Sequence, residues 1–73
     1  MNAAKFEAHR TQKDGKPAVE FVVRNSMSNP ALHAECIRLG VEPSVGISNR
    51  RAIICTTPEA IIAIQTAMRP FFA

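Results

Sequence analysis

A stretch near the N-terminus, AKFEAHRTQKDGKPAVEFVVR (residues 4–24), restricts the fold more than any other part of the chain. Two runs that alternate apolar and polar residues flank Asp14 and Gly15, a pair that tolerates the positive φ angles of a tight type I′ turn. A two-residue loop fixes the register of the two runs. One face then pairs Phe6 with Val23, Ala8 with Phe21, and Arg10 with Val19. The chain is therefore expected to begin with an antiparallel β-hairpin that has one mostly apolar face.

The next segment, SNPALHAECIRLGVEP (residues 28–43), carries the start and stop signals of a helix. Asn29 is a suitable N-cap, and Pro30 is pre-set for the first helical turn. Gly40 suits the left-handed position that follows a helix. The stripe expected to be buried consists of apolar residues at helical spacing: Leu32, Cys36 and Leu39, with Ile37 beside them. A helix is therefore predicted between Pro30 and Gly40.

The last part of the chain has the pattern of a strand followed by a helix. Residues 53–56 (Ile-Ile-Cys-Thr) are good strand formers, and residues 57–59 (Thr-Pro-Glu) supply an N-cap, a first helical residue and a first-turn acid. We expect this closing helix to run from Pro58 to about Arg69, because Pro70 disfavours helical geometry in the residue before it.

A further short strand is predicted at residues 45–47, with a turn at Ser48 and Asn49. Such a turn would place Arg50 and Arg51 together at the tip of a hairpin. Adjacent residues of a strand point to opposite faces, so only a turn could present both arginines to one partner.

These elements predict one globular domain, residues 1–73, of the α+β class, in the order ββαβ(β)α. Two helices are expected to pack on one face of a small antiparallel sheet, made of the N-terminal hairpin and one or two later strands. The hydrophobic content of 47% with 21% charged residues is typical of a globular chain. A core built from 73 residues is small, so we expect a homodimer or a heteromeric complex.

Composition also restricts the compartment and the partner. No run approaches the roughly 18 apolar residues of a membrane span, and the N-terminal MNAAKFEAHR has charges where a signal peptide is apolar. We therefore expect a cytoplasmic protein, with no membrane partner and with reduced thiols at Cys36 and Cys55. The net charge of +3 favours an acidic partner, either an acidic protein surface or a nucleic acid.

Residues that could carry chemistry are few. Cys55 lies at a strand end before a helix N-terminus, where a thiolate can be stabilised, but no histidine stands at a spacing that makes it a base for Cys55. His33 and Cys36 are three residues apart on the first helix, and His9 with Cys55 could complete a zinc site, yet zinc sites usually show two close ligand pairs. We therefore predict a protein that is not an enzyme and has no catalytic residue, metal or cofactor.

The segment at residues 35–51, ECIRLGVEPSVGISNRR, has partial likeness to a helix-turn-helix. Cys36, Leu39, Gly40 and Val41 match the small, apolar, glycine and apolar positions of that motif. Gly46, however, falls where the second helix needs a packed aliphatic residue, between two β-branched neighbours. A small DNA-binding transcriptional regulator therefore remains the alternative function.

The leading hypothesis is a small binding protein that regulates or inhibits a larger macromolecule by occupying its surface. Small size without catalytic motifs is typical of the inhibitors of host machinery that phages and plasmids encode. The closing helix is apolar nearly all round, with Ile62 away from its core stripe of Ile61, Ile64 and Met68, so a partner is expected to cover it. The residues expected to contact the partner are Asn49, Arg50, Arg51, Ile62, Arg69, Phe71 and Phe72.

Overall fold

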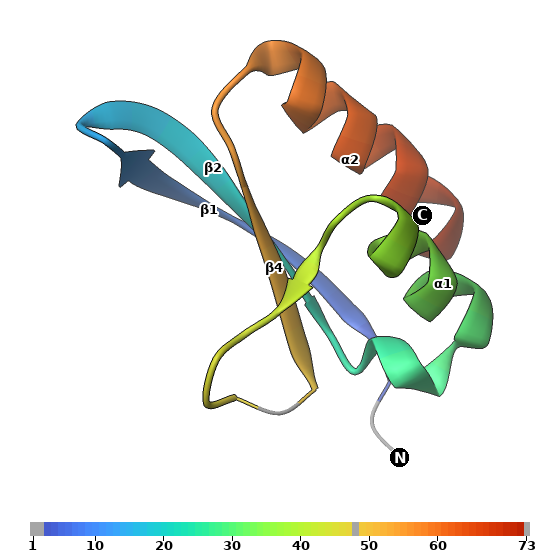
Figure 1. Cartoon of the computed structure of the whole chain (residues 1–73). Coiled ribbons are helices and arrows are strands. Elements are labelled where there is room, and N and C mark those ends of the chain that lie inside the picture. The colour runs from blue at the N-terminus through green and yellow to red at the C-terminus, as the bar shows by residue number, and fades with distance from the viewer. Residues whose placement is uncertain (1–2, 48, 73) are drawn as a thin grey trace.

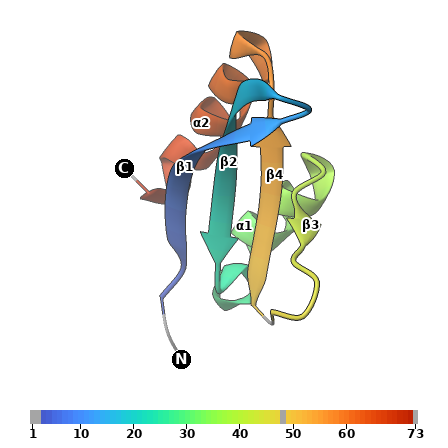
Figure 2. The ribbon, with the colours of Figure 1, turned by 90° about the vertical axis from the view of Figure 1, so that its left-hand side faces the viewer.

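The computed structural model of the chain describes residues 3–47 and 49–72. A four-stranded antiparallel sheet has the order β1-β2-β4-β3, and both α-helices cover the same face of it (Figures 1 and 2). The predicted α+β fold with two helices on one face is therefore confirmed. The elements in chain order are β1 (Lys5–Lys13), β2 (Lys16–Arg24), the short 3-10 helix η1 (Ser26–Ser28), α1 (Pro30–Arg38), β3 (Glu42–Pro43), β4 (Arg50–Cys55) and α2 (Pro58–Phe72).

The N-terminal hairpin has the register predicted from its turn. Asp14 and Gly15 adopt φ angles of 53° and 77°, as a type I′ turn requires. Phe6 lies opposite Val23 and Ala8 opposite Phe21. The alternate residues Val19, Phe21 and Val23 of β2 pack toward the helices.

Helix α1 begins and ends where its capping residues predict. The Asn29 side chain accepts hydrogen bonds from the backbone N–H groups of Ala31 and Leu32. At the other end Gly40 has φ +77°, and its N–H donates to the Ile37 carbonyl at 3.1 Å while the Val41 N–H donates to the Cys36 carbonyl at 2.9 Å. This pair of bonds is a Schellman motif.

The predicted buried stripe of α1 needs one correction. Leu32 and Cys36 are fully buried and Leu39 is half-buried, but Ile37 is 57% exposed. Ile37 follows Cys36 by one position, about 100° around the helix, and so lies at the margin of a face centred on Leu32 and Cys36.

The core lies between the sheet and the two helices. Three phenylalanines from different elements stack in it: the Phe6 ring lies 5.4 Å from Phe21 and 5.6 Å from Phe72, centroid to centroid. Such a stack joins β1, β2 and the last turn of α2. The fully or nearly buried members of the core are Phe21, Val23, Leu32, Cys36, Val41, Cys55, Ile64 and Met68.

The segment between the helices differs from the prediction. Residues 45–47 form no strand; the short strand β3 lies earlier, at Glu42–Pro43, and Ser48 is outside the described residues. Arg50 and Arg51 belong to β4, so their placement at a hairpin tip was wrong. Strand β2 continues to Arg24, and Arg24 pairs with Arg50. Strand β4 therefore begins at Arg50.

The helix-turn-helix interpretation fails for the same segment. After α1 the described residues up to Arg51 form a loop, the strand β3 and the start of β4, with no second helix among them. A recognition helix in that part of the chain is therefore contradicted by the structure.

Helix α2 continues three residues beyond the predicted end at Arg69, with Pro70 inside its last turn. Proline removes one backbone N–H there, and its usual acceptor, the carbonyl of exposed Thr66, can bond water instead. The stacking of Phe72 on Phe6 favours continued helix, because it keeps the C-terminal turn against the core.

Candidate functional site

A small groove opens at the end of the fold where η1, α1 and the loop between β3 and β4 meet. Its cavity volume is about 170 Å³. We call it the end groove. Its lining includes Met27, His33, Pro43, Ile47 and Asn49, with Arg50 and Arg51 in its wall.

Large apolar side chains are exposed in and beside the end groove. Met27 is 71% exposed and Ile47 is 51% exposed, while Val45, two residues before Ile47 in the same loop, is 99% exposed. Ile37 lies one helical turn after His33, on the same side of α1, and is also exposed. Single exposed aliphatic residues are ordinary, but Met27 and Ile47 line the same groove, and exposed apolar residues that gather in this way are typical of a binding surface.

Backbone hydrogen bonds hold the loop that carries Val45 and Ile47. The Ser44 N–H donates to the Arg50 carbonyl at 2.8 Å, and the Asn25 N–H donates to the Asn49 carbonyl at 2.8 Å. The second bond ties the start of η1 to the far end of the loop. The apolar side chains therefore project from a loop anchored at both ends.

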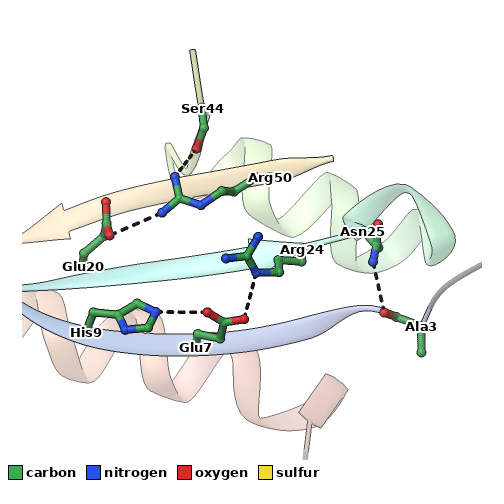
Figure 3. A network of polar contacts seen from close by, with 8 residues as sticks. All are labelled: Ala3, Glu7, His9, Glu20, Arg24, Asn25, Ser44 and Arg50. Atoms are coloured by element: carbon green, nitrogen blue, oxygen red, sulfur yellow. Dashed lines mark hydrogen bonds and ion pairs between the residues drawn. The ribbon is translucent and has the colours of Figure 1, made fainter. Parts of the chain in front are cut away.

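Arg50 and Arg51 have structural contacts on opposite faces of the sheet. Arg50 donates from Nη1 to Ser44 Oγ at 2.7 Å and lies 3.5 Å from a Glu20 carboxylate oxygen (Figure 3). Arg51 donates from Nη1 to the Val41 carbonyl at 2.9 Å. The two arginines therefore stabilise the groove wall from opposite faces of the sheet. The prediction that a turn presents both arginines to one partner is wrong.

The floor of the end groove contains one buried polar contact. Ser26 is 4% exposed, and its Oγ lies 3.0 Å from His33 Nδ1. This contact joins η1 to the first turn of α1 and gives the buried hydroxyl a partner.

The predicted partner-binding residues fall into two separate places. Asn49, Arg50 and Arg51 meet at the end groove. The remaining four lie on α2: Ile62 and Arg69 are exposed, whereas Phe71 and Phe72 are half-buried against the core. Phe72 also stacks on Phe6, so it contributes to the fold and is not a free anchor for a partner.

Sequence reasoning missed Met27, Pro43, Val45 and Ile47 as residues of the site. Met27 lies in SMS, outside any periodic pattern, and an apolar residue isolated in a polar segment was the available signal there. Val45 was assigned to a strand at residues 45–47 that does not form, which hid its exposure.

The face of the sheet away from the helices carries mainly polar residues, together with Ile54, which is 41% exposed. Glu7 on β1 accepts a hydrogen bond from Arg24 Nε on β2 at 2.8 Å and lies 3.0 Å from His9 Nε2 (Figure 3). Val22 lies on this face opposite Glu7 and Ala52, and it is nevertheless fully buried. The charged side chains around Val22 therefore shield an apolar residue from water.

The pair of Glu7 with Arg24 predicts a pH effect on stability. The hydrogen bond from Arg24, and then that from His9, lower the pKa of Glu7 below its ordinary 4.5. Ionised Glu7 therefore stabilises the fold above pH 4.5, and this contribution is lost as pH falls through the lower pKa of the folded state. Urea unfolding should find the Glu7→Gln variant less stable than the parent at neutral pH, with the difference shrinking as pH falls below 4.5. Glu42→Gln, at an exposed carboxylate on β3, is the control, and an equal pH effect there would contradict the role of Glu7.

The surroundings of the two thiols favour their protonated form. Cys36 and Cys55 are unpaired and buried, and burial raises the pKa of each thiol. A cleft of about 520 Å³ lies beside Cys55, with Arg10 and Thr57 in its lining, but neither histidine lines it. Within residues 3–47 and 49–72 no group of three metal-ligating side chains comes together.

Comparisons with family models, with curated proteins and with solved structures find no match to this chain. In the described ranges, no helix combines the length and the apolar character needed to cross a membrane. Among the described residues, the exposed apolar side chains of Met27 and Ile47 meet in the lining of the end groove.

Proposed function

We propose that this protein is a non-enzymatic binding module that regulates or inhibits a larger protein by docking its end groove on that protein's surface. The exposed apolar group around the groove, Met27, Val45 and Ile47, is the observation that carries this proposal. The partner supplies one apolar side chain that enters the groove, and Val45 packs against the surface beside it.

The size of the groove supports a side-chain anchor and not a metabolite. Small-molecule sites usually span about 300–1,000 Å³ and enclose most of the ligand. A groove of about 170 Å³ is smaller than that range. Protein interfaces, in contrast, are commonly centred on one anchor in a small pocket, surrounded by contacts that exclude water.

Charge supports an acidic partner surface. The chain carries a net charge of +3, and Arg50 and Arg51 lie in the groove wall. Each guanidinium has five N–H donors, so the contacts that Arg50 makes to Ser44 and Glu20 leave donors for a partner carboxylate. We assign the module to the cytoplasm, which its two unpaired thiols support.

The experiment is a pull-down from nuclease-treated lysate of the native host, followed by affinity measurement with each captured protein. The Ile47→Asp variant should bind its partner at least about tenfold more weakly, because a carboxylate would be buried in the contact. The matched control is Ile62→Asp on α2, since the two isoleucines are 51% and 60% exposed. Circular dichroism should show that both variants fold.

Two results would contradict the proposal. Loss of the partner after nuclease treatment would indicate nucleic-acid binding. Loss of binding in Ile62→Asp with retention in Ile47→Asp would move the interface to α2, as the apolar character of that helix predicts.

A further inference from the structure

Strand β1 forms one complete edge of the sheet. It is nine residues long and, among the described residues, pairs only with β2 (Figure 2). Residues that flank a two-residue turn exchange hydrogen bonds, and the bonding alternates from there. Pro17, which has no N–H, lies opposite Gln12, at a position where the paired residues exchange no hydrogen bonds. The β1 residues whose backbone N–H and C=O point outward are therefore Phe6, Ala8, Arg10 and Gln12.

We propose that a second copy of this chain pairs with that edge, β1 against β1, antiparallel and about a twofold axis at Ala8. In an antiparallel pair of strands, two residues that exchange hydrogen bonds both point their backbone N–H and C=O groups toward the other strand. A β1 residue whose backbone groups point away from β2 therefore pairs with another such residue of the second copy. The axis is perpendicular to the sheet. The two sheets would join into one, with the helices of both copies on the same side.

Electrostatics exclude the neighbouring registers. An axis at Glu7 would place two carboxylates opposite each other, and an axis at Arg10 would do the same with two guanidinium groups. An axis at His9 would place Lys5 of each copy opposite Lys13 of the other copy. Like charges directly opposite each other destabilise a pair of strands.

The register at Ala8 gives favourable pairs throughout its centre. Glu7 of each copy lies opposite His9 of the other copy. At these two positions the strands approach each other most closely. Phe6 faces Arg10 of the second copy; the faces of the Phe6 ring contact Phe21 and Phe72, so the aliphatic stem of Arg10 packs against the remaining exposed edge of the ring. Ala8 is exposed and small, and it meets its own equivalent at the axis without a clash.

This assembly leaves the end groove free. Strands β1 and β3 are opposite edges of the sheet, and the loop of Val45 and Ile47 follows β3 (Figure 2). Dimer formation and partner binding can therefore be tested independently. For a chain of this size, pairing of edges also adds buried surface to a small core.

Cysteine crosslinking tests the register. In the Ala8→Cys variant the two new thiols would face each other at a Cα separation of about 5.5 Å, within the range of a disulfide. Mild oxidation should give a covalent dimer on a denaturing gel. Arg10→Cys, on the same face of the same strand, is the matched control, because its equivalents would lie roughly 13 Å apart. Both variants retain the buried Cys36 and Cys55.

Sedimentation tests whether the edge is used. The unmodified chain should show a concentration-dependent dimer. Ala8→Pro removes two central hydrogen bonds of the dimer without removing a bond to β2, and should weaken dimerisation by about tenfold or more. A strict monomer at all concentrations would overturn the proposal. Equal crosslinking of the Arg10→Cys and Ala8→Cys variants would also overturn the proposal. This crosslinking test does not depend on whether the Ala8→Pro variant folds.

Discussion

Replacing Phe21 with alanine should remove a large part of the protein's free energy of unfolding. Phe21 is 1% exposed, and its ring stacks on Phe6, which in turn stacks on Phe72. Truncation of a buried phenylalanine typically costs about 3–5 kcal/mol. The whole free energy of unfolding of a 73-residue domain is roughly 4–11 kcal/mol, so this one change removes a large part of it.

Urea unfolding followed by circular dichroism measures the effect. Ile62→Ala serves as the control, since Ile62 is 60% exposed and its truncation should change stability by about 0.5 kcal/mol or less. A loss below about 1 kcal/mol for Phe21→Ala would mean that the aromatic stack does not hold the hairpin to α2.

The Arg51→Ala variant should lose about 1–3 kcal/mol of stability, because the buried Val41 carbonyl is left without its hydrogen bond. Val41 is 2% exposed, and Arg51 donates to its carbonyl from β4. Arg50→Ala should lose about 1 kcal/mol or less, since the ion pair of Arg50 with Glu20 is long and partly exposed.

Comparing the two alanine variants by thermal and urea unfolding separates folding from binding. Equal and small losses would show that Arg51 does not brace the end of α1. Affinity for a partner must accordingly be expressed per folded molecule, since an unfolded fraction of the Arg51 variant would imitate a binding defect.

The features that could be predicted from the sequence are those with local causes. The Asp14-Gly15 turn determines the hairpin register, and Asn29 and Gly40 determine the ends of α1. The end of α2 could not be predicted in this way. Pro70 is a local stop signal, but contact of Phe72 with Phe6, far away in sequence, outweighs it.

The candidate site could be predicted only in part. Asn49, Arg50 and Arg51 were recognised as residues near one site, but their geometry depends on distant groups. Arg50 lies in a strand because β2 provides its pairing partner, and Arg51 finds an acceptor in the carbonyl of Val41. The exposure of Met27 likewise depends on how η1 meets a loop some twenty residues later, which no local pattern encodes.

The two edges of the sheet differ in a way that limits polymerisation. Strand β3 has only two residues, and one of them, Pro43, has no backbone N–H. Short edge strands and prolines are the devices by which natural sheets prevent continuous growth. A chain with one long edge and one blocked edge can add a neighbour on one side only. Self-association by strand pairing would thus stop at a closed pair and would not extend into a fibre.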